Sequence, residues 1–282
     1  MALTEKSAPY AHWEYVHPGS GDRLRIIPER GGLVSEWCCG GREVLYFDQQ
    51  RYADPSKSIR GGIPVLFPIC GNLPDDRLVV NGVAHTLAQH GFARDLPWVL
   101  QLLDDQSGIR LSLQSTGQTE AAYPFAFLLE MEVRPVDQAL EISTTIHNRS
   151  ADSMPFSFGL HPYFQVSDLS RTRLTGLADR CLNHLEMAAA DTAPQLDRLP
   201  QGVDFLCQPN GPVTLIDDAT GAQLQLQHQA PFDLSVVWTE PPRPMVCLEP
   251  WTGPRQALLS GDRKLVLDPG AQQTLTCRYA VL

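Results

Sequence analysis

A histidine set within an apolar run is the first candidate for proton transfer in this sequence. His161 lies in residues 157–164, among phenylalanine, leucine and tyrosine side chains and directly before a proline. These neighbours predict an imidazole that is partly buried and rigidly held, which can donate or accept a proton near neutral pH. Because burial disfavours the charged form of a histidine, its protonation requires a carboxylate or another hydrogen-bond partner in the folded chain.

A carboxylate in a similarly apolar setting is the second candidate. Glu249 follows the apolar residues 245–248 and precedes a proline and Trp251. An unpartnered carboxylate is costly in such a place, so we expect it to have a partner or a function. The alternative is a glutamate that caps the neighbouring turn. The functional interpretation is favoured because histidines in suitable contexts occur elsewhere in the chain.

Two basic segments add candidate ligand contacts. Arg60 stands directly before two glycines, which permit close backbone approach to a ligand, and its guanidinium could offer a fork of donors to hydroxyls or phosphate. Taken alone, this segment is more typical of a bulged strand end with a solvated arginine. His90 is followed by a glycine and stands near Arg94, so both can reach one cleft, but a structural histidine is an equally open interpretation. Trp238 and Trp251 could offer an apolar face to a sugar ring, although core tryptophans are more common.

Period-two alternation of apolar and polar residues is the main structural pattern, and we expect it from about residue 99 onward. Residues 127–134 and 140–147 alternate on either side of a short break, which predicts a β-hairpin. Helical periodicity is scarce, with short candidates at 255–259 and within 182–190. With 21 glycines and 23 prolines between short strands, the chain is expected to be mostly antiparallel β, a large sandwich. Further strands are expected at residues 109–114, 213–216, 222–227, 234–238, 264–267 and 274–281.

Length and composition favour one domain over residues 1–282. Sandwiches and barrels often reach this length as single units, and no linker, repeat or low-complexity tract divides the chain. With 22 basic against 32 acidic residues, the net charge of −10 argues against nucleic acid as a partner. No apolar run is long enough for a signal peptide or a membrane span, so we expect a cytoplasmic protein with no membrane partner. The sequence leaves the oligomeric state open.

Metal and cofactor chemistry lack their usual sequence patterns. The seven cysteines are an odd, scattered set that we expect to be mostly reduced, and no Cys-x-x-Cys pair or zinc-type spacing occurs. The motifs of serine-based acyl transfer, nucleotide hydrolysis and dinucleotide binding are lacking as well. We therefore expect no metal and no organic cofactor, and a reaction carried by histidine and glutamate.

Four segments stand out in order along the chain: Arg60-Gly61-Gly62-Ile63-Pro64, His90-Gly91-Phe92-Ala93-Arg94, Gly159-Leu160-His161-Pro162-Tyr163-Phe164 and Leu248-Glu249-Pro250-Trp251. Together they resemble the aldose 1-epimerase (galactose mutarotase-like) family, and they spread from about residue 58 to residue 254. The second segment is more similar to the branch that includes the hexose-6-phosphate mutarotases than to the galactose enzymes.

The resemblance implies an antiparallel β-supersandwich with few short helices, an open cleft for a small-molecule sugar or sugar phosphate, and no cofactor. It places His161 and Glu249 in the positions of the catalytic histidine and glutamate. By the same likeness, the substrate-binding positions fall on Arg60, on His90 as the second active-site histidine, on Asp204 and, for a phosphate, on Arg94.

The implied reaction interconverts the α and β anomers of a hexose or hexose 6-phosphate. A base removes the proton of the anomeric hydroxyl while an acid protonates the ring oxygen, and the opened chain rotates before it closes again. Glu249 fits the base and His161 the acid, each contributing about 10²–10⁴-fold. On this scheme, His161 is expected to enter the reaction protonated.

Two other functions remain as alternatives. A non-catalytic carbohydrate-binding domain of the same fold would keep the cleft, but it needs no acid and base, so the presence of both His161 and Glu249 counts against it. A glycosidase usually needs two carboxylates across the bond that breaks, and Glu249 is the one obvious candidate.

Overall fold

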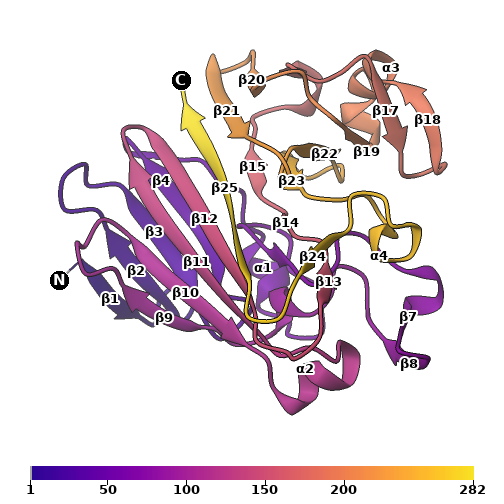
Figure 1. The fold of residues 1–282 in the computed structure, drawn as a ribbon. Helices are drawn as coiled ribbons and strands as arrows, with labels where there is room; N and C mark the ends of the chain where they lie inside the picture. Colours follow the sequence, from indigo (N-terminus) through magenta and orange to yellow (C-terminus); the bar gives the residue numbers. More distant parts are fainter. Residues whose placement is uncertain (1) are drawn as a thin grey trace.

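The hairpin expected in the middle of the chain lies at the centre of an eight-stranded antiparallel sheet in the computed structural model, which describes residues 2–282 (Figure 1). Its strands are β11 (Phe127–Val136) and β12 (Ala139–Asn148), in which buried residues alternate with half-buried ones as predicted. The sheet order is β16-β20-β21-β25-β12-β11-β10-β9. The other strands are β9 (Val99–Leu102), β10 (Ile109–Gln114), β16 (Thr172–Thr175), β20 (Val213–Asp217), β21 (Ala222–His228) and β25 (Gln272–Val281).

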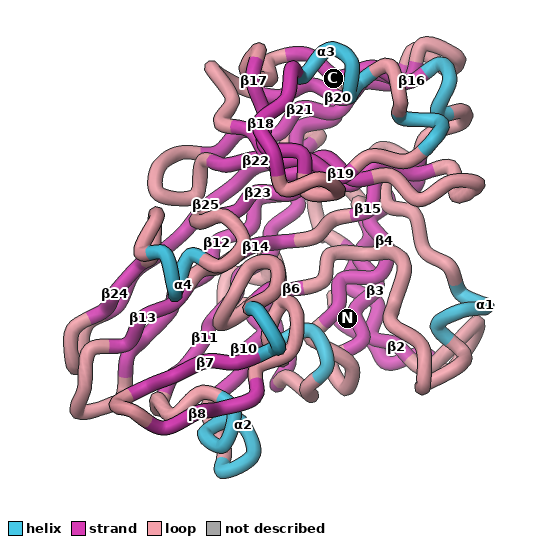
Figure 2. The backbone as a smooth tube through the Cα atoms, turned by 90° about the vertical axis from the view of Figure 1, so that its right-hand side faces the viewer, coloured by secondary structure: helices cyan, strands magenta, loops and turns pink. Residues whose placement is uncertain are grey.

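A second large sheet has the order β18-β17-β19-β22-β23-β14-β6, and β15 also pairs with β23. In Figure 2 it runs from β18 at the top of the view to β6 near the middle. Every residue of β23 is buried, so this strand is covered on both faces. The strands are β6 (Val65–Leu66), β14 (Gly159–Leu160), β15 (Tyr163–Gln165), β17 (Arg180–Asn183), β18 (Ala188–Asp191), β19 (Asp204–Cys207), β22 (Leu234–Trp238) and β23 (Met245–Trp251).

A five-stranded N-terminal sheet precedes the region in which alternation was expected, so that expectation was too narrow. Strand β3 shows why, because its burial pattern breaks alternation where the register shifts between Arg25 and Ile26. The strands of this sheet are β1 (Leu3–Lys6), β2 (His12–Val16), β3 (Arg23–Ile27), β4 (Leu33–Cys39) and β5 (Arg42–Glu43). Two ribbons complete the strands: β7 (Arg77–Val80) with β8 (Val83–Thr86), and β13 (Met154–Phe156) with β24 (Leu265–Leu267).

Helices are few and short, which confirms the expected fold class. The candidate at 255–259 overlaps α4, but the candidate within 182–190 is wrong: this segment forms the hairpin of β17 and β18, in which Leu182 pairs with Ala189. Pairing across the strands overrides the helix propensity of the alanines there. The helices are α1 (Gln49–Tyr52), α2 (Gly117–Ala122), α3 (Thr192–Leu196) and α4 (Ala257–Ser260), with 3₁₀ turns at Pro74–Asp76, Ala93–Asp95, Leu169–Arg171 and Leu199–Gln201. No helix within residues 2–282 is long and apolar enough to cross a membrane.

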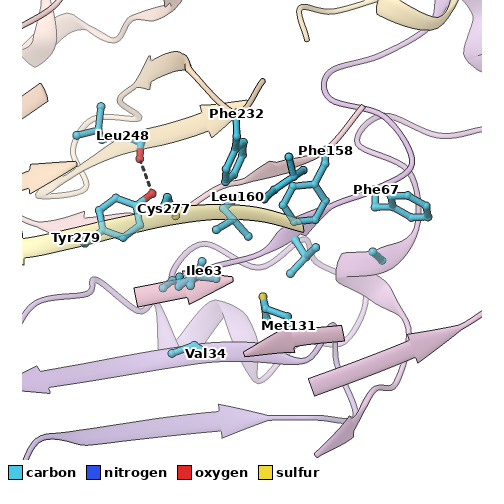
Figure 3. Close-up of a cluster of buried hydrophobic side chains, with 14 of the residues drawn as sticks. Val34, Ile63, Phe67, Met131, Phe158, Leu160, Phe232, Leu248, Cys277 and Tyr279 are labelled. Atoms are coloured by element: carbon cyan, nitrogen blue, oxygen red, sulfur yellow. Dashed lines mark hydrogen bonds between the residues drawn. The ribbon is translucent and has the colours of Figure 1, made fainter. Parts of the chain in front are cut away.

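The main core draws apolar side chains from all three large sheets. Figure 3 shows Val34 from β4, Met131 from β11 and Leu248 from β23 in one buried cluster. The hydroxyl of Tyr279 in β25 donates a hydrogen bond of 3.2 Å to the carbonyl oxygen of Leu248 in this cluster. Such contacts fix the second sheet, and with it β23, against the first.

Candidate active site

All six residues predicted for the site line one pocket of about 430 Å³ beside the second sheet. The structure therefore brings together segments that are distant in the sequence. These residues are Arg60, His90, Arg94, His161, Asp204 and Glu249. Both tryptophans considered above also line the pocket, together with residues that sequence reasoning did not single out: Ser58, Gln89, Tyr163, Val236 and Arg255.

Strand alternation places Glu249 toward the pocket. Successive side chains of a strand point to opposite faces, so Glu249 shares a face of β23 with Cys247 and Trp251. The neighbouring strand β22 aligns Val236 with Glu249 and Trp238 with Cys247. One face of two adjacent, buried strands thus forms a wall of the pocket.

The proton carriers proposed from sequence are in contact with each other. The Nε2 atom of His161 lies 3.3 Å from Oε1 of Glu249, and the indole N–H of Trp251 donates a hydrogen bond of 3.1 Å to the other carboxylate oxygen. Burial raises the pKa of Glu249 well above its usual range, and the charge of Asp204 acts in the same direction. Burial lowers the pKa of His161 to about 3, with a further contribution from the charge of Arg94.

These opposite shifts favour a neutral pair, with the shared proton on Glu249 and none on Nε2 of His161. Glu249 is the carboxylate partner that the sequence did not identify. Because burial of both groups disfavours their charged forms, the protonated His161 that the reaction scheme expects is not the form that burial favours.

Aromatic rings hold the imidazole of His161 in place. It stacks on Tyr163, with ring centroids 4.8 Å apart and planes 16° apart, and Trp238 meets it nearly edge-on at 5.7 Å. The backbone N–H of His161 also donates to the carbonyl oxygen of Pro64 at 2.9 Å. These contacts restrict the ring, and the rigidity of this histidine stays a prediction.

His90 is anchored by its own backbone and ring to Gly71. Its N–H donates 2.6 Å to the Gly71 carbonyl oxygen, while the Gly71 N–H donates 3.0 Å to Nδ1 of the ring. The neutral imidazole therefore carries its proton on Nε2. Gly91 is required next in the chain, since a Cβ there would lie 2.1 Å from the carbonyl oxygen of Phe67. Burial, and then the charge of Arg94, lowers the pKa of His90 well below its usual range.

Asp204, at the start of β19, is held from two sides. Its Oδ1 lies 2.7 Å from Nδ1 of His184, and its Oδ2 accepts a hydrogen bond of 2.8 Å from Arg255. Neither partner had been predicted, because nothing local in the sequence distinguishes them.

Arg60 differs from the solvated arginine that its segment alone favoured. Its guanidinium is half-buried, donates two hydrogen bonds of 2.8 and 3.1 Å to Glu240, and lies 5.4 Å from the ring centroid of Trp238. Chain packing requires the glycine that follows it, because a Cβ at Gly61 would lie 2.5 Å from the Cα of Phe47. This agrees with the structural interpretation that the segment alone favoured for its glycines.

Arg94 keeps more of its hydrogen-bonding capacity. It donates 3.0 Å to the carbonyl oxygen of Gln89, and its nearest carboxylate, Asp95, is 3.7 Å away and largely exposed. Of the five N–H donors of a guanidinium, most remain available to a ligand in the pocket.

One set of side chains in residues 2–282 has the spacing to hold a metal ion: His161, Cys247 and Glu249 offer ligand atoms within 4.8 Å of one another. The Cys247 thiol is a poor ligand as it stands, because burial raises its pKa well above the usual range and metals bind the thiolate. That the reaction needs no metal stays a prediction.

Known proteins resemble half or more of this chain in sequence. A "Putative glucose-6-phosphate 1-epimerase" of Salmonella typhimurium is 30% identical over 159 residues, which cover 55% of this chain and 49% of that protein. A protein of the same name from Escherichia coli K12 is 28% identical over 214 residues, covering 74% of this chain and 67% of that protein. The chain thus aligns with about half the length of the Salmonella relative.

Solved structures share the whole fold. The Slr1438 protein of Synechocystis sp. PCC 6803 superimposes with a TM-score of 0.91 at 34% identity, over 100% of this chain and 98% of that one. A galactose mutarotase related enzyme of Lactobacillus acidophilus superimposes with a TM-score of 0.78 at 20% identity, over 95% and 97% of the two chains. The family described as aldose 1-epimerase matches residues 20–280, almost the entire sequence. On this match, and with the fold and pocket that accompany it, the chain belongs to the aldose 1-epimerase family.

Proposed function

We propose that the protein is an aldose 1-epimerase that interconverts the α and β anomers of a hexose, with His161 and Glu249 as proton carriers. The observation that carries this proposal is their contact: 3.3 Å between Nε2 and Oε1, in a pocket large enough for a sugar. Two titratable groups whose pKa values burial shifts in opposite directions suit proton transfer. A pocket that only bound sugars would not need them.

One proton shared by the pair is sufficient for both halves of the reaction. In ring opening, ionised Glu249 takes the proton of the anomeric hydroxyl, and protonated His161 gives its proton to the ring oxygen. This produces the open-chain aldehyde, protonated Glu249 and neutral His161. In ring closure on the other face, Glu249 returns a proton to the aldehyde oxygen while His161 accepts the proton of the attacking hydroxyl.

The neutral pair that burial favours is therefore the state between the two halves. The state that starts each opening differs from it by a single proton transfer across the 3.3 Å contact. The pair carries the same total number of protons in both states. The site therefore returns to its starting protonation after each cycle without exchanging protons with solvent.

The remaining pocket residues would hold the sugar in place. The Nε2–H of His90 is a donor, and the Asp204 carboxylate is an acceptor for hydroxyls. Trp238 and Tyr163 offer aromatic faces to the apolar side of a sugar ring.

We propose a hexose 6-phosphate as the substrate, with Arg94 as the phosphate contact. The names of the Salmonella and Escherichia coli relatives support a phosphorylated sugar, and Arg94 has unused donors. Arg60 suits neutral hydroxyls better, because a phosphate placed there would also meet the Glu240 carboxylate, 2.8 Å from the Arg60 Nε atom.

Polarimetry on freshly dissolved α anomers of glucose, galactose and glucose 6-phosphate tests the reaction. We expect His161→Asn to lower the rate at least about tenfold with the fold retained. His147→Asn is the matched control, because His147 also faces a glutamate, Glu130, at 3.0 Å, but on the eight-stranded sheet outside the pocket. Equal rates in the parent and both variants would refute the assignment. Sugar binding by calorimetry without any rate enhancement in the parent would favour the non-catalytic alternative.

The substrate is tested by kcat/KM for glucose and glucose 6-phosphate at two salt concentrations. Arg94→Ala should reduce kcat/KM for the phosphate ester alone, and the effect should weaken in high salt. Arg110→Ala, which breaks an ion pair with Glu132 on another sheet, is the control. A parent without preference for the phosphorylated sugar, or equal losses for both sugars, would leave a neutral aldose as the substrate.

We further propose that residues 1–282 work as one domain, since one buried apolar cluster draws on all three large sheets. The proposed location is the cytoplasm, because all seven cysteines are free, as suits a reducing compartment.

A further inference from the structure

A buried histidine outside the pocket contacts two of the residues that line it. His184 follows β17, and its side chain is 0% exposed. Its Nδ1 lies 2.7 Å from Oδ1 of Asp204, and its ring stacks on Trp251 with centroids 6.0 Å apart and planes 25° apart. Since a carboxylate only accepts hydrogen bonds, the Nδ1 atom of His184 carries a proton and donates it to Asp204.

Packing alone does not account for a histidine at this position. The other ring nitrogen, Nε2, is buried with no hydrogen-bond partner in the described chain. A buried polar atom without a partner costs free energy, so a phenylalanine would fill the same space beside Trp251 at lower cost. What the histidine adds is the hydrogen bond to Asp204.

Asp204 needs such a partner in order to face the pocket in one orientation. A carboxylate can rotate about its side-chain bonds, and the bond from Arg255 to Oδ2 fixes only one of its oxygens. His184, which does not line the pocket, fixes the other oxygen. The backbone N–H of His184 also donates 2.8 Å to the Asp204 carbonyl oxygen, which keeps the two residues in register whatever the side chain at 184.

We propose that His184 is a positioning residue for the epimerase reaction: by donating to Oδ1, it holds the Asp204 carboxylate in the orientation in which it faces the sugar and Glu249. This inference rests on the proposed function, because it assigns a role within the same site. His184 does not line the pocket, so it acts through Asp204 and does not touch the substrate.

Two substitutions separate the hydrogen bond from the packing. His184→Phe keeps a ring against Trp251 and loses the donor, whereas His184→Asn keeps a donor near the position of Nδ1 and loses the ring. Leu185→Ala is the control, because Leu185 is the next residue and is 61% exposed. Each variant is compared with the parent by polarimetry, thermal unfolding and circular dichroism.

We expect His184→Phe to melt at or above the parent temperature and yet lose at least about tenfold in kcat/KM. His184→Asn should recover kcat/KM to within about threefold of the parent, and Leu185→Ala should match the parent. In an Asp204→Asn background, His184→Phe should have less than about a twofold further effect, since a residue that acts through Asp204 has nothing left to position.

A folded His184→Phe variant with parental kcat/KM would overturn the proposal. So would equal losses in the Phe and Asn variants, or effects of His184→Phe and Asp204→Asn that multiply. Failure of the proposed function is distinguished by the parent and Glu249→Gln, which are measured first. A parent without activity on any sugar of the panel overturns both the function and the role of His184, whereas an active parent that depends on Glu249 leaves the His184 variants to decide.

Discussion

Replacing Glu249 by glutamine should separate activity from stability in one molecule. The amide has nearly the shape of the carboxyl group, and its oxygen can still accept the hydrogen bond that the Trp251 indole donates. It cannot take or return a proton, so the rate of anomer exchange should fall by about 10²–10⁴-fold, which is about 2.7–5.4 kcal/mol on the barrier.

Stability should move in the opposite direction. Burial, and then Asp204, raises the pKa of Glu249 in the folded state above the value of about 4.3 in an unfolded chain. The contribution of Glu249 to stability is therefore fully present below about pH 4.3 and is lost as pH rises through the folded pKa, because the unfolded chain ionises this carboxyl group more readily than the folded chain does. Glutamine carries no such penalty. The variant should unfold at or above the parent temperature at pH 7, and the difference should shrink at pH 4.

Glu240→Gln gives the opposite sign and serves as the control for stability. Burial acts to raise the pKa of Glu240, but the hydrogen bonds and charge of Arg60, with the charge of Arg243, outweigh it and lower that pKa. Its contribution to stability is present at neutral pH and lost as pH falls, so Glu240→Gln should melt below the parent at pH 7 and approach it in acid. Glu130→Gln is the control for activity. A Glu249→Gln variant that keeps the parental rate, or that is less stable than the parent at pH 7 while fully folded at pH 4, would refute the reasoning.

Three further outcomes follow from the geometry of the pocket. The first is measured with glucose, which has no phosphate group that could titrate in this range. Its kcat/KM should stay level from pH 6.5 down to about 5, because burial and the charge of Arg94 lower the pKa of His161 to about 3. A fall in kcat/KM toward acid pH with its midpoint near 6.5 would contradict this. Exhaustive chelation should leave the rate unchanged, and a loss restored by one divalent ion would point to the group formed by His161, Cys247 and Glu249. Glu240→Gln should leave the ratio of kcat/KM for glucose 6-phosphate to that for glucose unchanged, because Arg94 and not Arg60 is the proposed phosphate contact; a marked rise in this ratio in a folded variant would show that the released Arg60 guanidinium binds the phosphate.

The sequence was most informative where a single strand or a single short motif carries the signal. The hairpin of residues 127–148 is recognisable because each strand alternates regularly and faces water on one side. The histidine and glutamate of the pair stand out because each is a polar residue in an apolar run. These are local properties, and local properties can be read without knowing the fold.

Properties that depend on partners distant in the chain could not be predicted. The carboxylate that holds Arg60 is Glu240, 180 residues away. His184 lies in a segment with a weak helical pattern, and only the pairing of β17 with β19 brings it to Asp204. The pKa of His161 likewise depends on burial in the folded chain and on the charge of Arg94, 67 residues away in the sequence, so its direction could not be predicted from the local segment.

The two faces of strand β23 have different surroundings, and this limits which changes to the chain the fold can accept. Cys247, Glu249 and Trp251 lie on the face of β23 that forms a wall of the pocket, whereas Val246 and Leu248 belong to the central apolar cluster. Arg94, by contrast, lies on a short 3₁₀ turn, and Arg60 lies outside any strand. Variation in the connecting segments can therefore alter the charged side chains of the pocket while Glu249 stays in place. An insertion of one residue into β23 would instead exchange its two faces, so that Glu249 would leave the pocket and the core would lose its apolar side chains together.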